Sequence, residues 1–363
     1  MAGLAVALAE RGCRSTYVAQ RRTSTVGDRA SQGWGDFDMG SVEFRLAETQ
    51  AEVERLVESA ASDSIHVCES IRGKGSSGHA QAAVGRRGLR QWAVMERVKD
   101  QGLLGPLKRL AYRARVIGAR GRVEGVLAIG RGVPEWIVAR GFPADRVFPF
   151  TYFLGAAKGV TPTDPDSARG FRVAFAGRLV ELKRVDLLIE AIARLGRPEV
   201  ELEVIGTGPM EPILRELAAR LLPERVRWLG RMPFDRVPAQ LRHADCLVLP
   251  SRIDGWGAVV SEALMQGTPA VCSSECGASV AVEASGTGGV FASGSVDSLA
   301  AVLERQAAKG KVAPEERTRL ASWASCLGAE AGATYLLDIL AHAEGHAPRP
   351  AAPWSASTAP DAR

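Results

Sequence analysis

The sequence is poor in the features that mark a metal-binding or disulfide-bonded protein. Its 363 residues include six cysteines and five histidines. The cysteines form no C-x-x-C pair, and the histidines do not accompany them at metal-ligand spacing. We therefore expect free thiols in a reducing cytosol and neither a structural nor a catalytic metal.

Long apolar runs and the common nucleotide motifs are also missing. No uncharged run approaches the roughly 20 residues of a spanning helix. The apolar start is a poor secretory signal, because Glu10 and Arg11 end it and no basic segment precedes it. The loop 73–78 lacks the spacing of a P-loop, and no G-x-G-x-x-G opens either half, which argues against a nicotinamide-dependent dehydrogenase. These absences favour a cytoplasmic protein of another class.

What the sequence does contain is a regular alternation of strand and helix patterns, with 46% apolar residues to build cores. This pattern predicts an α/β fold with parallel sheets and two doubly wound, Rossmann-like domains. We expect six strands in the first half and five in the second. The predicted parts are a first domain (1–155), a linker (156–170), a second domain (171–325), a C-terminal helix (326–345) and a disordered tail (346–363).

The first domain begins unusually, with a helical pattern closed by Gly12. In a doubly wound domain a strand and a glycine loop precede this helix, and that strand is normally central in the sheet. We therefore expect either a start further upstream or an atypical first sheet.

One stretch of the second half carries most of the chemistry. An apolar strand pattern ends at Leu249, a glycine turn follows at 254–257, and a helical pattern runs from Ala258 to Gly267. Such a turn presents backbone N–H groups at a helix N-terminus, which suits anionic or hydroxyl-rich ligands. Two carboxylates flank it, Asp254 and Glu262, with seven residues between them. Taken alone, the stretch is also compatible with an ordinary βα turn.

The stretch resembles the donor site of retaining, nucleotide-sugar-dependent glycosyltransferases of family four, which have the GT-B fold of two facing domains with a cleft between them. Their E-x7-E signature stands here as Asp254-x7-Glu262, with the first glutamate replaced by the shorter aspartate. Further motifs follow the family in order. Gly177-Arg178 and Lys183 match G-R-x-x-x-x-K, although Arg184 replaces the usual glycine after the lysine. The remaining matches are Gly206-x-Gly208 and Leu229-Gly230-Arg231.

The resemblance implies specific roles for these residues. Arg178 and Lys183 would hold the donor diphosphate, Glu262 the ribose hydroxyls and Asp254 the sugar hydroxyls, so that Asp254, Arg178 and Lys183 form the catalytic set. Backbone groups of Gly257 and Ala258 would lie near sugar and phosphate. The whole predicted donor set is Gly177, Arg178, Lys183, Gly206, Gly208, Leu229, Gly230, Arg231, Asp254, Gly255, Trp256, Gly257, Ala258, Val259 and Glu262.

The first domain resembles the family only loosely. His66, Cys68 and Glu69 stand at a strand end where many members carry a histidine that faces the sugar, so they are candidates for the acceptor side. The alternative for His66 is a buried strand histidine without a role in binding.

Residues 72–122 hold thirteen basic and only two acidic residues. Within them Leu103, Leu107, Leu110, Ala114 and Ile117 recur at helical spacing, with arginines on one flank. One interpretation is a core-facing helix with a solvated basic side. The other is a surface for anionic membrane or a phosphorylated acceptor; nucleic acid is not expected, because no aromatic residues interleave with the charges.

The resemblance thus implies transfer of a sugar, with retention and without a cofactor, from a nucleotide-diphosphate sugar to a hydroxyl of a saccharide or lipid-linked saccharide. It also implies that the helix 326–345 packs back on the first domain. We expect a role in bacterial surface polysaccharide assembly, with peripheral attachment at the inner face of the plasma membrane. Two alternatives remain open: an inactive binding or scaffold protein, and a sugar-nucleotide epimerase of the same fold.

Overall fold

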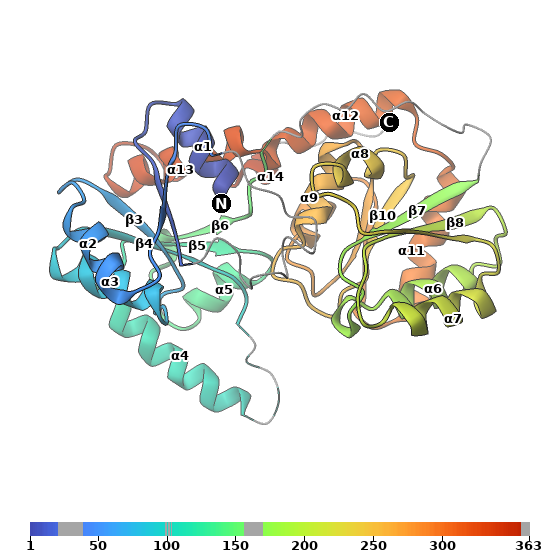
Figure 1. Cartoon of the computed structure of the whole chain (residues 1–363), viewed down its shortest axis with the longest axis horizontal. Coiled ribbons are helices and arrows are strands. Elements are labelled where there is room, and N and C mark those ends of the chain that lie inside the picture. The colour runs from blue at the N-terminus through green and yellow to red at the C-terminus, as the bar shows by residue number, and fades with distance from the viewer. Residues whose placement is uncertain (21–38, 99, 101, 103, 156–169, 357–363) are drawn as a thin grey trace. The chain divides into compact units, whose positions relative to one another are not determined.

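A computed structural model of the chain describes residues 1–20, 39–98, 100, 102, 104–155 and 170–356 (Figure 1). The chain divides into two compact units. The described part of the first comprises 1–20, 39–98, 100, 102, 104–152 and 332–352, and that of the second comprises 153–155, 170–331 and 353–356. All but the last residue of the predicted linker lies outside the described residues.

The described residues of the first unit form six parallel strands in two sheets. β1 (Thr16–Ala19) pairs with β2 (Glu43–Leu46). A separate sheet has the order β3-β4-β5-β6, formed by Ile65–Glu69, Arg90–Met95, Gly125–Ile129 and Val147–Phe150. Among the described residues no strand joins the two sheets. The helices are α1 (Ala2–Glu10), α2 (Gln50–Glu58), α3 (Ser76–Arg86), α4 (Gly105–Ala119), α5 (Val133–Val138) and α13 (Ala329–Ala343).

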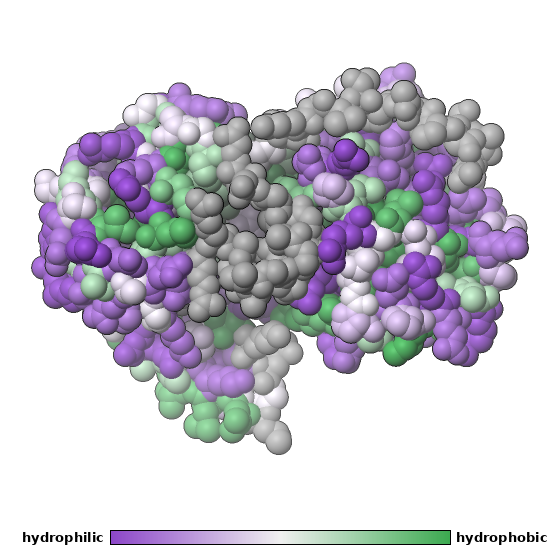
Figure 2. All heavy atoms as spheres, viewed as in Figure 1, coloured by the Kyte–Doolittle hydropathy of each residue, from purple (hydrophilic) through white to green (hydrophobic). Residues whose placement is uncertain are grey.

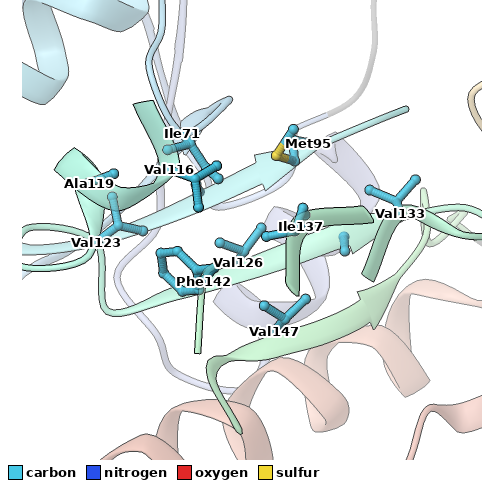
Figure 3. Close-up of a cluster of buried hydrophobic side chains, with 12 residues drawn as sticks. Ile71, Met95, Val116, Ala119, Val123, Val126, Val133, Ile137, Phe142 and Val147 are labelled. Carbon is cyan, nitrogen blue, oxygen red and sulfur yellow. The ribbon is translucent and has the colours of Figure 1, made fainter. Parts of the chain in front are cut away.

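One buried hydrophobic cluster of the first unit lies between the four-stranded sheet and two helices, α4 and α5. β4, β5 and β6 contribute Met95, Val126 and Val147, while the helices contribute Val116 and Ile137 (Figure 3). A second cluster involves α2 and α3. β5 is buried along its whole length, as expected of a central parallel strand with both faces covered.

The C-terminal segment corrects one prediction. Residues 346–356, assigned to a disordered tail, are ordered: Arg349 donates hydrogen bonds to the carbonyls of Ala144 and Asp145, and α14 (Pro353–Ala356) follows. Trp354 is buried and lies 5.7 Å from Trp256, ring centroid to ring centroid. The aromatic side chain gives this proline-rich segment enough apolar area to dock.

The exposure of α4 tests the first of the two interpretations, a core-facing apolar stripe. The side chains that face the core are few and small, because Gly105, Val116 and Ala119 are the buried residues of the helix. Leu107 and Leu110 are 64% and 65% exposed, and Ile117 is 45% exposed. The interpretation as a core-facing stripe is therefore wrong; Leu103 lies outside the described residues.

The second unit is a six-stranded parallel sheet of order β12-β11-β10-β7-β8-β9. In chain order the strands are Phe171–Ala176, Val200–Ile205, Val226–Gly230, Cys246–Leu249, Ala270–Ser273 and Gly289–Phe291. The sixth was not predicted, because three residues carry no periodic signal. The helices are α6 (Val185–Arg194), α7 (Glu211–Leu221), α8 (Val237–Leu241), α9 (Ala258–Met265), α10 (Ser279–Ala284), α11 (Val296–Lys309) and α12 (Pro314–Ala324). This strand order reverses between β7 and β10, and ligands of doubly wound sheets bind at the carboxyl ends of the strands beside such a reversal.

Glycines bring the turns after β7 and β8 together at this edge. Gly206 has φ +133° and its amide donates to the carbonyl of Gly230. A Cβ on Gly206 would lie far closer than 3.0 Å to the carbonyl oxygen of Gly177, and one on Gly208 would clash in the same way with Leu179. Both positions therefore require glycine for backbone-to-backbone contact.

We predict that Gly206→Ala lowers the free energy of unfolding by at least about 2 kcal/mol, because the clash is with backbone that cannot move aside. Gly85→Ala in α3 is the control: its Cβ meets open space, so the change should stabilise by about 0.5–1 kcal/mol. Urea denaturation monitored by circular dichroism gives both values. Equal stability of Gly206→Ala and wild type would contradict the required close approach.

Candidate functional site

The predicted donor motifs gather at the carboxyl edge of the second unit. β7 pairs with both β8 and β10. Since all three strands are parallel, the turns that follow them lie at one edge. These turns contain Gly177-Arg178, Gly206 to Gly208 and the stretch from Asp254 to Gly257. β9 adds Leu229 and Gly230 at its own carboxyl end, next to the turn of Gly206.

The glycine turn after β10 packs closely against its neighbours and leads into the N-terminus of α9. Gly257 has φ +90° and forms the N-cap of α9. A Cβ there would lie 2.6 Å from Leu249 Cδ2 and 2.9 Å from Cys276 Sγ. At the start of α9 the Val260 amide donates to the Gly257 carbonyl, whereas the amides of Ala258 and Val259 precede the first intrahelical hydrogen bond. The helix dipole makes this end positive. An anionic or hydroxyl-bearing group can bind there.

Asp254 is held at the mouth of this turn by an ion pair. Lys183 Nζ lies 2.6 Å from Asp254 Oδ2, and both side chains are largely buried. Ser251 Oγ reaches the same oxygen at 3.4 Å. Two residues assigned to different parts of the donor, the diphosphate and the sugar, are thus directly paired. The pair links the turn after β7 with the turn after β10, across the point where the strand order reverses.

Glu262 is the second carboxylate of the motif and has a different environment. It lies in α9, one turn from the helix start, and is only 8% exposed. Within the described residues its carboxylate has no hydrogen-bond or ion-pair partner. Burial raises the pKa of Glu262 from 4.5 to about 7. A buried carboxylate without a partner is costly for a protein unless a ligand supplies hydrogen-bond donors.

The cations of the site differ in exposure. Arg178 is exposed, whereas Lys183 is half-buried. Arg184, which follows Lys183 in place of the usual glycine, adopts φ +52° and pairs with Asp186 at 3.1 Å. Arg231 is exposed just beyond β9. Positive charge is therefore present on both sides of the glycine turn of β8.

Trp256 contributes differently from its neighbours in the predicted donor set. Its side chain is 1% exposed and donates a hydrogen bond to Ser261 Oγ. Its carbonyl accepts from the amide of Ala278 and from Cys276 Sγ. Trp256 therefore anchors the turn from the interior, and its side chain is not available to a ligand.

One segment that supports the glycine turn, residues 274–277, was not predicted from the sequence. The Asp254 amide donates to the carbonyl of Glu275, and Gly277 donates back to the carbonyl of Asp254. This segment follows β11 and adds a short bridge between Asp254 and Cys276. The only sequence signal for it is the polar run Ser273-Ser-Glu-Cys-Gly277 after a buried strand.

The acceptor-side candidates lie in β3 of the first unit. His66 Nε2 is 2.9 Å from Ser64 Oγ; burial, and secondarily the charge of Arg87, lowers the pKa of His66. Cys68 is buried, which raises the pKa of its thiol to about 11. The Glu69 side chain is exposed at the carboxyl end of the strand. A half-buried neutral histidine fits either interpretation of this position.

The described residues offer neither a clustered metal site nor a membrane-spanning helix. They contain no group of three or more histidine, cysteine, aspartate or glutamate side chains with the geometry of a metal site. Among them there is also no helix with the length and apolar character needed to cross a bilayer.

The sequence model of the family glycosyl transferases group 1 matches residues 167–322. This segment comprises most of the second unit and includes every predicted donor residue. The second unit is thus similar in sequence to the glycosyl transferases group 1, in agreement with the E-x7-E resemblance.

A relative and two solved structures are also similar. The D-inositol 3-phosphate glycosyltransferase of Nocardia farcinica is 37% identical over 143 residues, covering 37% of this chain and 30% of that protein. Anabaena HepE in complex with UDP-glucose has a TM-score of 0.61 and 18% identity, covering 95% of this chain and 93% of HepE. A Listeria monocytogenes protein assigned as a UDP-N-acetylglucosamine 2-epimerase has a TM-score of 0.57 and 16% identity, covering 97% and 94%.

These similarities differ in what they show. The chain spans less than half the length of the curated relatives it matches, between 26% and 48% of the first few. At identities below a fifth, the structural neighbours show the fold alone, which is the GT-B fold. The predicted fold class is thereby confirmed.

The buried carboxylate predicts an unusual pH dependence of stability. Because the pKa of Glu262 is about 7 in the folded protein and 4.5 unfolded, the folded state binds the extra proton between these values. Stability should therefore fall as pH rises from about 4.5 to 7, by up to about 3 kcal/mol. Glu262→Gln should not show this loss. Its free energy of unfolding should therefore compare more favourably with that of wild type at pH 8 than at pH 4.

Urea denaturation across this pH range measures the difference. Glu216→Gln on α7 serves as control, since Glu216 is exposed. Parallel stability profiles for wild type and Glu262→Gln would show that the carboxylate is not desolvated.

Proposed function

We propose that the protein transfers a sugar from a nucleotide-diphosphate sugar to an acceptor hydroxyl, without a metal ion. The observation that carries this proposal is the buried, unpartnered Glu262 carboxylate beside the free amides of α9, with Arg178 and Lys183 at the same edge of the sheet. A carboxylate without hydrogen-bond donors, beside the helix-start amides and the exposed Arg178, fits a ligand that has both hydroxyls and a diphosphate. A nucleotide-diphosphate sugar has both.

In this proposal each group has a chemical task. Glu262 accepts hydrogen bonds from the ribose hydroxyls, and the amides of Gly257 and Ala258 with Arg178 bind the diphosphate. The acceptor oxygen bonds to the anomeric carbon as the bond from that carbon to the diphosphate breaks. Negative charge then develops on the leaving diphosphate, where fixed positive groups stabilise the transition state. The family resemblance favours retention at the anomeric carbon.

The Lys183–Asp254 pair suggests how the donor is accommodated. In the described structure the lysine charge is compensated by Asp254 at 2.6 Å. When a diphosphate binds, Lys183 can turn to it, and Asp254 then accepts hydrogen bonds from the sugar hydroxyls. Before the donor binds, the ion pair would thus keep both side chains at the site with their charges compensated.

For the acceptor we propose a saccharide or a lipid-linked saccharide, in bacterial surface polysaccharide assembly. The basic character of residues 72–122 supports an acceptor presented at an anionic membrane, and peripheral attachment at the inner face of the plasma membrane would follow. His66 and Glu69 remain the candidate acceptor-side residues of the first unit.

Transfer by the purified protein decides between this proposal and its alternatives. Nucleotide-sugar donors are incubated with saccharide and lipid-linked acceptors, and sugar transfer and released nucleotide diphosphate are measured together. Conversion of the donor sugar without transfer would indicate the epimerase. Donor binding without turnover would indicate an inactive binding protein.

We expect Glu262→Ala to weaken binding of the cognate nucleoside diphosphate by at least about tenfold, because charge-assisted hydrogen bonds are worth roughly 1.5–3 kcal/mol each. Wild-type affinity should also rise as pH increases through 7, since the ionised carboxylate is the better acceptor. Titration calorimetry measures both effects, with Glu216→Ala as control. Affinity that is independent of both the substitution and pH would remove Glu262 from the site.

Asp254→Asn should behave differently. It removes the charge that pairs with Lys183, so binding of free nucleoside diphosphate should be kept or strengthened. Transfer should fall at least about a hundredfold, as expected when a group that contacts the reacting sugar is lost. Calorimetry beside the transfer assay separates the two effects. Loss of diphosphate binding in this variant would contradict the assignment of Asp254 to the sugar.

A further inference from the structure

We infer that α4 is a membrane-docking helix that inserts its exposed apolar face into an anionic lipid surface. This inference rests on the proposed function, because that function supplies the lipid-linked acceptor. It adds which helix, and which face of that helix, contacts the membrane. α4 lies at the lower edge of the first unit in Figure 1, and Figure 2 shows apolar side chains gathered there beside charged ones.

The helix is apolar on the side that faces away from the core. Val116 and Ala119 pack into the core, whereas Leu107, Leu110 and Ile117 are largely exposed. At about 100° per residue, the exposed leucines lie roughly opposite Val116 on the helix. Leu104, 61% exposed, extends this face before the first turn. A soluble surface rarely leaves so many large aliphatic side chains together without an interaction to cover them.

Basic side chains border this apolar face on both flanks. Lys108 and Arg115 lie on one side of the exposed face, and Arg113 lies on the other, by the same helical spacing. The segment 105–119 contains no aspartate or glutamate. An apolar face bordered by cations on each side is the arrangement of helices that lie in the membrane interface, where long basic side chains reach the headgroups. This charge complementarity favours anionic lipid over a neutral apolar partner.

The core-facing side of α4 is fixed to its own unit. Asp100 accepts hydrogen bonds from Trp136 Nε1 at 2.9 Å and from Arg140 at 2.7 Å. Arg109 donates to the carbonyl of Asp100, and the Tyr112 ring meets the Trp136 ring edge-on at 5.3 Å. These contacts hold the helix in place, so its outer face is presented in a fixed orientation and need not fold on binding.

The test uses the full chain and vesicles of phosphatidylcholine with or without about a third phosphatidylglycerol. We expect wild type to sediment with the anionic vesicles and far less with the neutral ones. Leu107→Ser/Leu110→Ser should lower the partition coefficient at least about tenfold, because two exposed leucines no longer insert. This loss should persist at about 1 M salt, where the Debye length is about 3 Å.

A second variant isolates the electrostatic part. Lys108→Gln/Arg113→Gln should lower binding about tenfold at low salt; neither side chain makes a hydrogen bond or ion pair within the described residues. The matched controls are Ile213→Ser on α7, where Ile213 is 60% exposed, and Arg220→Gln/Arg319→Gln, which removes two exposed charges elsewhere. Both controls should bind vesicles like wild type.

Several outcomes would overturn the inference. One is wild type that stays in solution with anionic vesicles; another is a control that loses as much binding as the α4 variants. Sedimentation velocity would identify the face as a contact between copies if wild type is dimeric and Leu107→Ser/Leu110→Ser is monomeric without a change in vesicle binding. Nucleoside diphosphate affinity is measured on the same samples and should be unchanged in every variant. Failure of vesicle binding with normal nucleotide binding would thus reject the docking helix and leave the proposed transferase intact.

Discussion

The candidate site depends on the backbone contact between the turns that follow β7 and β8. The Leu179 amide donates to the carbonyl of Thr207, and the Met210 amide donates to the carbonyl of Leu179. These bonds form only because Gly206 and Gly208 carry no side chain between the two turns. With the backbones joined, the side chains of Arg178 and Lys183 are left to extend from the edge of the sheet, and α6 and α7 begin at defined positions beside it.

The charges at this edge are only partly compensated. Lys183 and Asp254 neutralise each other, while the buried Glu262 carboxylate has no partner among the described residues. A protein that evolved only for stability would replace such a carboxylate with an apolar or amide side chain. Groups that cost stability persist where a ligand uses them. The uncompensated carboxylate, the amide-rich start of α9 and the exposed Arg178 are therefore best understood together, as parts of one binding site.

Much of this site could be predicted from the sequence, because its motifs are local. Asp254, Gly257 and Glu262 belong to a single strand–turn–helix segment, and sequence spacing sets their relation directly. The Lys183–Asp254 pair could not be predicted, because it joins residues 71 apart and both had been assigned to a ligand. Trp256 was assigned to the donor from its place in the motif, yet its indole points into the interior. Sequence spacing does not tell which neighbours of a glycine turn face the ligand.

The errors in the fold have similar causes. The three-residue strand β12 is too short for a period to show. The apolar stripe of α4 was located correctly, but the sequence did not tell whether the stripe faces the core or the solvent. A helix can pack on its core through small residues such as Gly105 and Ala119. The ordered C-terminal segment depends on Trp354, whose aromatic partners Phe153 and Trp256 lie far away in the sequence. Each of these features is decided by tertiary packing rather than by local pattern.

Hydrogen exchange of the full chain, with and without a saturating nucleoside diphosphate, tests the central claim most directly. The account predicts slower exchange of backbone amides in 177–183, 206–208 and 254–262, at the carboxyl edge of the second sheet. The amino edge of the same sheet, near Arg172 and Asp245, should be unaffected. Bound nucleotide that protects other segments and leaves these three unchanged would contradict the account.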